Sequence, residues 1–110
     1  MLPGYKPFKI YKGDTFAFRL SLDSGSSNYN ITNHTFIAQI KEKGKSAPVA
    51  SFTYTVQNAT DGIVLLTLPA SESANLIGGR KYEYDVQMTN SGVVSTILYG
   101  PVVVVADVSS

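Results

Sequence analysis

Cysteine and tryptophan are absent from this chain of 110 residues, and histidine occurs once, as His34. Without cysteine the chain forms neither a disulfide nor a thiolate metal site, so packing and strand pairing have to supply its stability. Charged residues make up 15% of the sequence, against roughly 25% in an average protein. The formal net charge is +1, and lysine and arginine are scattered, so the concentrated basic face that nucleic-acid binding needs is missing.

Long apolar runs are also missing. The longest, residues 102–106, is far shorter than the roughly 20 residues of a membrane-spanning helix. The first six residues have no charged start followed by an apolar run, so we expect no signal peptide. Three Asn-x-Thr sequons begin at Asn30, Asn33 and Asn58. Without a signal peptide, we interpret them as chance products of a chain rich in Ser, Thr and Asn.

What the chain does contain favours β-structure. Hydrophobic residues make up 44% of it, with seven Tyr and five Phe, a composition typical of strand-rich domains and not of disorder. A chain of this length forms one domain, which buries roughly 60–70% of its unfolded surface. Pro3, Gly4 and Pro7 predict that residues 1–7 form an extended N-terminal arm, with a single domain over 8–110.

Alternation of apolar and polar residues predicts about seven strands. The clearest pattern is the one in which Phe16, Phe18 and Leu20 share one face. Residues 70–76 carry a helical signal that allows one or two turns. The other predicted strands are 8–11, 35–41, 50–57, 62–68, 82–88 and a return strand that ends in the valines 102–105.

Strand spacing of about 10–14 residues predicts an all-β fold, an immunoglobulin-like antiparallel β-sandwich with one short helical turn. Its predicted core consists of Phe16, Phe18, Leu20, Ile40, Phe52, Leu66, Tyr84 and Val86.

Tyr82 follows a Gly-Gly pair at the start of the penultimate predicted strand. In immunoglobulin-like sandwiches a tyrosine placed there often bonds through its hydroxyl to the preceding loop, an arrangement called a tyrosine corner. We predict that role for Tyr82. The alternative is a half-buried ring without a special hydrogen bond.

Four consecutive valines at 102–105 put apolar side chains on both faces of the last predicted strand. One face enters the core, and the other needs cover. Either the strand is central and partly shielded, or a neighbouring subunit packs over it. We predict a protein interface that contains Leu2, Tyr5, Val103 and Val105.

Residue types that carry chemistry are few and separated. His34 has no evident nucleophile or carboxylate partner, so we interpret it as a loop or strand-edge residue. Glu83 and Asp85 lie two residues apart on one strand face. A calcium site needs six or more oxygen ligands, usually from a loop, so a solvated outer face is the favoured interpretation. We therefore expect no enzyme activity, no catalytic residue, no metal site and no cofactor.

The order of these elements resembles the N-terminal immunoglobulin-like domain of phage baseplate upper proteins and related small virion proteins of tailed phages. The segments that carry the resemblance cover roughly residues 8–108, and they are residues 11–15 and 16–20, 31–32, 38–41, 62–68, 69–74, 82–87, 92–100 and the final valine strand. Baseplate upper proteins continue into a fibre-forming region, whereas this sequence ends at Ser110. The resemblance therefore implies a stand-alone structural subunit of a virion.

The sequence supports two hypotheses for the function, which belong to different classes. The leading one is a non-enzymatic structural protein of a tailed-phage virion, in the tail, baseplate or fibre attachment or on the capsid surface as a decoration protein. Its partners would be other virion proteins and copies of itself, bound through the arm and exposed strands, with no nucleic acid or membrane. The alternative is a carbohydrate-binding β-sandwich module, because sandwiches with exposed tyrosines can bind sugars.

Overall fold

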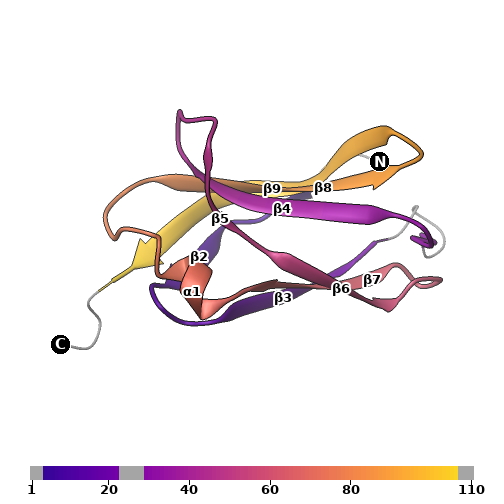
Figure 1. Cartoon of the computed structure of the whole chain (residues 1–110), viewed down its shortest axis with the longest axis horizontal. Coiled ribbons are helices and arrows are strands. Elements are labelled where there is room, and N and C mark those ends of the chain that lie inside the picture. Colours follow the sequence, from indigo (N-terminus) through magenta and orange to yellow (C-terminus); the bar gives the residue numbers. More distant parts are fainter. Residues whose placement is uncertain (1–3, 23–28, 107–110) are drawn as a thin grey trace.

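The computed structural model describes residues 4–22 and 29–106, in which strands form two sheets that pack face to face (Figure 1). The predicted all-β sandwich is therefore confirmed. A single short helix, α1 (Ala70–Ser73), is present in the described part of the chain. It follows Pro69 and lies inside the range that carried the helical signal.

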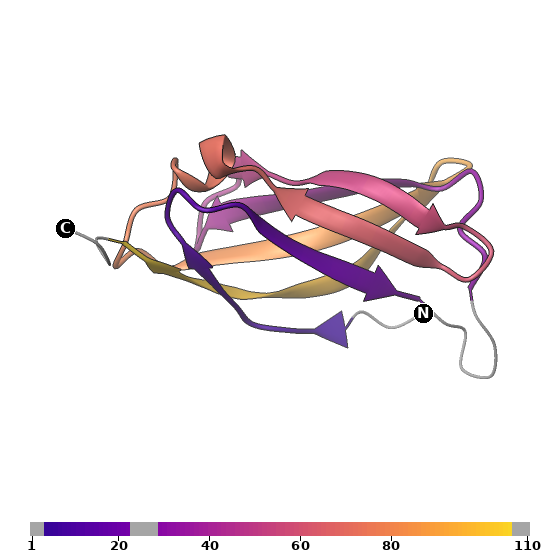
Figure 2. The same cartoon turned by 90° about the horizontal axis from the view of Figure 1, so that it is seen from below.

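The larger sheet is built around the longest strand of the chain. Its order is β1 (Gly4–Tyr5), β9 (Val93–Val105), β8 (Tyr82–Asn90), β4 (Thr35–Glu42) and β5 (Pro48–Ser51), and β2 (Phe8–Tyr11) also pairs with β9. The smaller sheet has the order β3 (Phe16–Ser21), β7 (Ile63–Leu68) and β6 (Thr53–Asn58). Figure 2 shows the smaller sheet in front of the larger one.

The described residues form nine strands, two more than the sequence predicts. The strand predicted over 50–57 changes sheets at Phe52, which is buried between them. Its first part becomes β5 beside β4, and its second part becomes β6 beside β7. Alternation continues through Phe52, so sequence periodicity does not reveal the crossing. The second extra strand is β1.

The N-terminal strands correct one further expectation. Both β1 and β2 run parallel to β9, whereas the sequence predicts an antiparallel sandwich. They do so because β2 continues through a turn at residues 12–15 into β3 of the opposite sheet and does not form a hairpin with a neighbour. Within the segment 1–7, which is predicted to be an extended arm, Gly4 and Tyr5 are extended and pair with Leu98 and Tyr99 of β9. Leu2 lies outside the described residues.

Helix α1 fixes the turn that leads from β2 to β3. The hydroxyl of Ser73 is fully buried; it accepts a hydrogen bond from the Gly13 amide at 3.0 Å and donates one to the Asp14 carbonyl at 2.7 Å. The carboxylate of Glu72 accepts a bond from the Ser51 amide at 2.8 Å. Because the buried Ser73 hydroxyl bonds to both Gly13 and Asp14, it holds the turn between β2 and β3 against the helix, while Glu72 ties the helix to β5.

The core lies between the sheets and is formed by alternate residues of facing strands. Of the predicted core residues, Ile40, Phe52, Leu66, Tyr84 and Val86 are buried. Phe16, Phe18 and Leu20 are half-buried, which corrects their prediction as core residues. Their face is right, since each packs against the core, but β3 is an edge strand and its side chains are covered from one side only.

The difference in burial between core residues and residues of β3 can be measured on two phenylalanines that pack together. The Phe8 ring is buried and lies within 5.0 Å of the ring centroids of Phe16, Phe18 and Tyr84. Phe8→Ala should therefore lower the free energy of unfolding by about 3–5 kcal/mol. Phe18→Ala should cost less, because water already reaches part of the Phe18 ring. Urea unfolding of the two variants tests this order, and an equal or larger loss for Phe18→Ala would contradict the burial described for β3.

Candidate functional site

The outward side of the larger sheet collects most of the exposed apolar surface. Ten large hydrophobic side chains are exposed in the described ranges 4–22 and 29–106. Pairing registers place six of them on this side, which we call the outer face, and they are Tyr5, Tyr11, Ile37, Val94, Tyr99 and Val103. Single exposed apolar residues are ordinary, but their concentration on one sheet face marks a candidate contact surface.

Strand β9 explains how the outer face arises. Successive side chains of a strand point to opposite sides, so Val102 and Val104 are buried while Val103 is 57% exposed. Val105 is half-buried and shares its side of the sheet with Val103. The structure therefore brings together three of the four residues that the sequence predicts as an interface, namely Tyr5, Val103 and Val105.

Polar side chains of the neighbouring strands border the outward apolar residues of β9 on the outer face. Asp85 of β8 pairs with Tyr99 on one side and with Gln39 of β4 on the other, so the three side chains form a row across the sheet. In the next row, Glu83 lies opposite Lys41. The two rows line an open groove of about 430 Å³, and Tyr5 and Lys43 also contribute to its wall.

The paired rings of Tyr5 and Tyr99 form one wall of the groove. Their centroids are 5.4 Å apart, with the ring planes at 73°, an edge-to-face arrangement that aromatic pairs favour. The backbone holds Tyr5 there, because the Lys6 amide donates to the Tyr99 carbonyl at 2.9 Å and the Tyr84 hydroxyl donates to the Lys6 carbonyl at 2.8 Å. The first strand thus completes the groove wall.

Burial raises the pKa of the Tyr84 hydroxyl above its usual value. The hydroxyl is therefore protonated in the folded protein and can donate its hydrogen bond to Lys6. Since the folded state binds this proton more tightly than the unfolded state, its contribution to stability is present below the unfolded pKa of about 10 and declines as the pH rises above that value.

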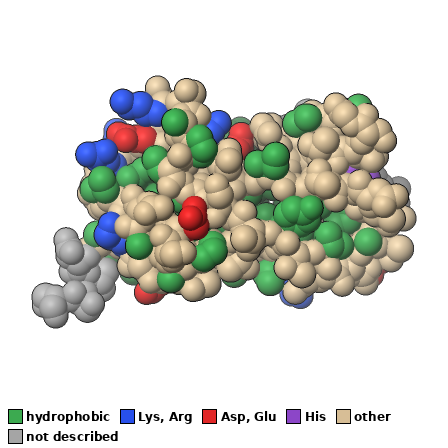
Figure 3. Space-filling view, viewed as in Figure 1, with side chains coloured by type: hydrophobic (Ala, Val, Ile, Leu, Met, Phe, Trp, Pro, Cys, Tyr) green, Lys and Arg blue, Asp and Glu red, His purple; other side chains and the backbone are tan. Residues whose placement is uncertain are grey.

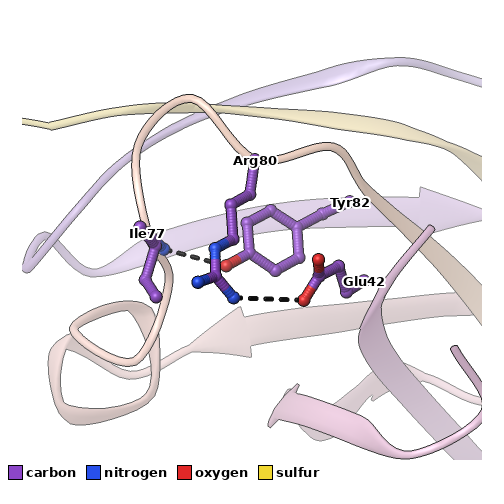
Figure 4. Close-up of polar contacts among 4 residues, drawn as sticks. All are labelled: Glu42, Ile77, Arg80 and Tyr82. Atoms are coloured by element: carbon purple, nitrogen blue, oxygen red, sulfur yellow. Dashed lines mark hydrogen bonds and ion pairs between the residues drawn. The ribbon is translucent and has the colours of Figure 1, made fainter.

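Tyr82 has the loop contact of a tyrosine corner. Its hydroxyl accepts a hydrogen bond from the Ile77 amide at 2.9 Å, which ties the start of β8 to the loop after α1 (Figure 4). Next to it, Arg80 and Glu42 form an ion pair at 3.3 Å on the surface. These contacts position β8, and with it Glu83 and Asp85, but Tyr82 itself points into the core.

The remaining chemical candidates lie apart from one another. The His34 ring contacts Tyr29, and its Nδ1 lies 2.9 Å from the Thr32 carbonyl oxygen. Its neighbour Thr35 pairs with Thr89, at the opposite end of β8 from Glu83 and Asp85. Within residues 4–22 and 29–106, no three His, Cys, Asp or Glu side chains are placed to hold a metal ion. The helix in the described part of the chain is too short to cross a membrane.

Sequence reasoning missed most of the outer face. Tyr11, Val94 and Tyr99 are not among the predicted interface residues. Alternation from Val103 indicates Tyr99, but a register shift between Val86 and Gln87 of β8 is what brings Val94 to the outer face, where alternation would put Val93. Alternation puts Ile37 and Phe36 on opposite sides of their strand, but nothing local in the sequence places Ile37 on the same sheet face as Tyr99. Only the pairing of β4, β8 and β9 shows that these residues share one surface.

Comparison of the sequence with models of known protein families finds no match, and no significant match is found among curated proteins.

Removal of one hydroxyl tests how the N-terminal strand is held. Tyr84→Phe loses the bond to the Lys6 carbonyl and should lower the free energy of unfolding by about 1 kcal/mol. Hydrogen exchange of the Lys6 amide should become faster. Tyr82→Phe is the matched control, since it removes a hydroxyl bonded to Ile77 instead. Unchanged Lys6 exchange in Tyr84→Phe, or the same acceleration in Tyr82→Phe, would contradict the proposed attachment.

Proposed function

We propose that this protein is a non-enzymatic structural subunit of a tailed-phage virion that works through protein–protein contacts made by its outer face. The concentration of exposed apolar side chains on one side of the larger sheet supports this function most directly. The resemblance of the ordered sequence elements to small virion proteins with an immunoglobulin-like domain supports the virion setting.

The composition of the outer face suits a protein partner. Tyrosines and aliphatic residues lie along β9 and the two N-terminal strands, with Lys9 of β2 and charged side chains of β8 and β4 beside them. Protein interfaces commonly have an apolar, aromatic centre and a polar rim. Contacts of this kind can be weak for one copy and strong for a particle that carries many copies.

The virion role predicts that a charge on the outer face reduces incorporation into particles. Val103→Lys replaces an apolar side chain of the outer face with a second ammonium group beside Lys9, and a partner would have to desolvate both. Incorporation should fall several-fold, as judged by quantitative mass spectrometry of purified particles from phage that carry the variant. The matched control is Ile77→Lys, whose position is 45% exposed but lies on the loop after α1.

The two variants give distinct outcomes. Normal occupancy for Ile77→Lys with reduced occupancy for Val103→Lys supports the outer face as the contact surface. Equal occupancy of the wild type and Val103→Lys, with both proteins folded by circular dichroism, would contradict it. Absence of the wild-type protein from purified particles would contradict the virion role itself.

A second function has one specific observation in its favour. The groove beside Tyr5 and Tyr99 combines an aromatic wall with Asp85, Gln39 and Lys41. A neutral sugar ring could stack on a tyrosine and exchange hydrogen bonds with this mixture of donors and acceptors. Binding of neutral oligosaccharides by the isolated domain would favour this carbohydrate-binding function, whereas co-purification with particles favours the virion function.

A further inference from the structure

Strand β6 is the edge of the smaller sheet, and all six of its residues are exposed. It pairs with β7 on one side, and no other described strand pairs with it. Its sequence, Thr-Tyr-Thr-Val-Gln-Asn, is uncharged. More widely, no charged residue occurs between Lys45 and Asp61. Figure 3 shows the consequence, since charged side chains gather at the end of the molecule with the β4–β5 hairpin and are sparse over β6.

Natural sheets protect free edges with charges, prolines, bulges or short strands. The other edges in the described part of the chain have such protection. Strand β3 carries Arg19, β5 has four residues and begins at Pro48, and the β1–β2 edge is interrupted at Lys6 and Pro7. Strand β6 has a bulge only towards its end, between Val56 and Asn58, so it is regular from Thr53 to Val56.

The core-facing side of β6 is also incompletely covered. Tyr54 and Val56 are each 38% exposed, whereas their partners on β7, Leu66 and Val64, are 1% and 0% exposed. The Tyr54 ring packs edge-to-face on Phe36 of the opposite sheet at 5.3 Å between centroids and so closes the core at this edge. One more strand beside β6 would cover both side chains.

We propose that β6 pairs antiparallel with β6 of a second copy of this chain across a two-fold axis. The occupant is a second copy because symmetric pairing places each side chain near its own equivalent, and an uncharged strand brings no like charges together. A partner recognised by charge would have nothing to bind on this strand. The two smaller sheets would then join into one continuous sheet.

Alternation and cross-strand side-chain pairing together favour one register of β6 against β6. Opposed residues of an antiparallel pair must lie on the same side of the sheet, so Thr55 on the two-fold axis places Tyr54 opposite Val56 of the other copy. An aromatic side chain opposite a β-branched one, and threonine opposite threonine, are favourable cross-strand pairs. Both half-exposed core-facing side chains would be covered in this arrangement.

This inference sharpens the multicopy part of the proposed function, because it names a surface that joins copies. It concerns β6 on the smaller sheet, whereas the virion contact is proposed for the outer face of the larger sheet. Its test uses the isolated protein and no particle, so its failure is distinguishable from a failure of the outer-face proposal.

Sedimentation equilibrium over a range of concentrations tests the pairing. The wild type should form dimers, and Thr55→Lys should weaken dimerisation by about tenfold or more because two ammonium groups meet on the axis. Thr55→Glu should do the same through its carboxylates. An equimolar mixture of the two variants should dimerise again, because opposite charges then face each other. Ala17→Lys is the matched control, on the exposed side of β3 at the other edge of the same sheet.

The outcomes decide the proposal. Dimers of the wild type and of Ala17→Lys, with monomeric Thr55 variants that recover on mixing, support pairing through β6. A wild type that stays monomeric up to its solubility limit overturns it. Dimers that Thr55→Lys and Thr55→Glu leave intact, or that Ala17→Lys weakens equally, also overturn it, because the copies would then meet elsewhere. Circular dichroism establishes that each variant is folded.

Discussion

The close approach of two backbones at Gly100 is the constraint on which the rest of the structure depends. Any side chain at Gly100 would overlap the carbonyl group of Lys6. Because glycine leaves this space free, the N-terminal segment lies directly along β9, where Lys6 bonds to Tyr99 and receives the Tyr84 hydroxyl. From there β2 adds Phe8 and Ile10 to the core. A larger residue at Gly100 would displace core and surface residues together.

The same parallel pairing lets β9 both fill the core and form part of the contact surface, two roles that its sequence alone does not separate. The inward valines of β9 fill the core, and the outward residues form a stripe that Tyr5 and Tyr11 widen from the neighbouring strands. Stability and contact surface therefore depend on one alternating strand. The smaller sheet has no such outward stripe; its distinctive feature is the uncharged edge at β6. The two sheets thus present surfaces of different kinds, a broad apolar face and a narrow pairing edge.

Local pattern was enough to predict the sandwich, the short helix and the loop bond of Tyr82, because alternation, turn residues and the Gly-Gly step all lie within short stretches of sequence. It was not enough for features that depend on distant pairing. The change of sheet at Phe52 preserves alternation, and the docking of Gly4 and Tyr5 depends on a glycine about 95 residues away. For the same reason the valines 102–105 revealed that one face needs cover, but not that Ile37 lies on that face.

The central claim is that the outer face of the larger sheet is the surface by which this domain is held in a particle. Hydroxyl-radical footprinting of the free protein and of purified particles compares side-chain accessibility in the two states. The claim predicts that Tyr5, Tyr11 and Tyr99 lose most of their reactivity in particles, while Ile77, exposed on the loop after α1, keeps its own. Outer-face tyrosines that react equally in both states, or uniform protection that includes Ile77, would contradict it.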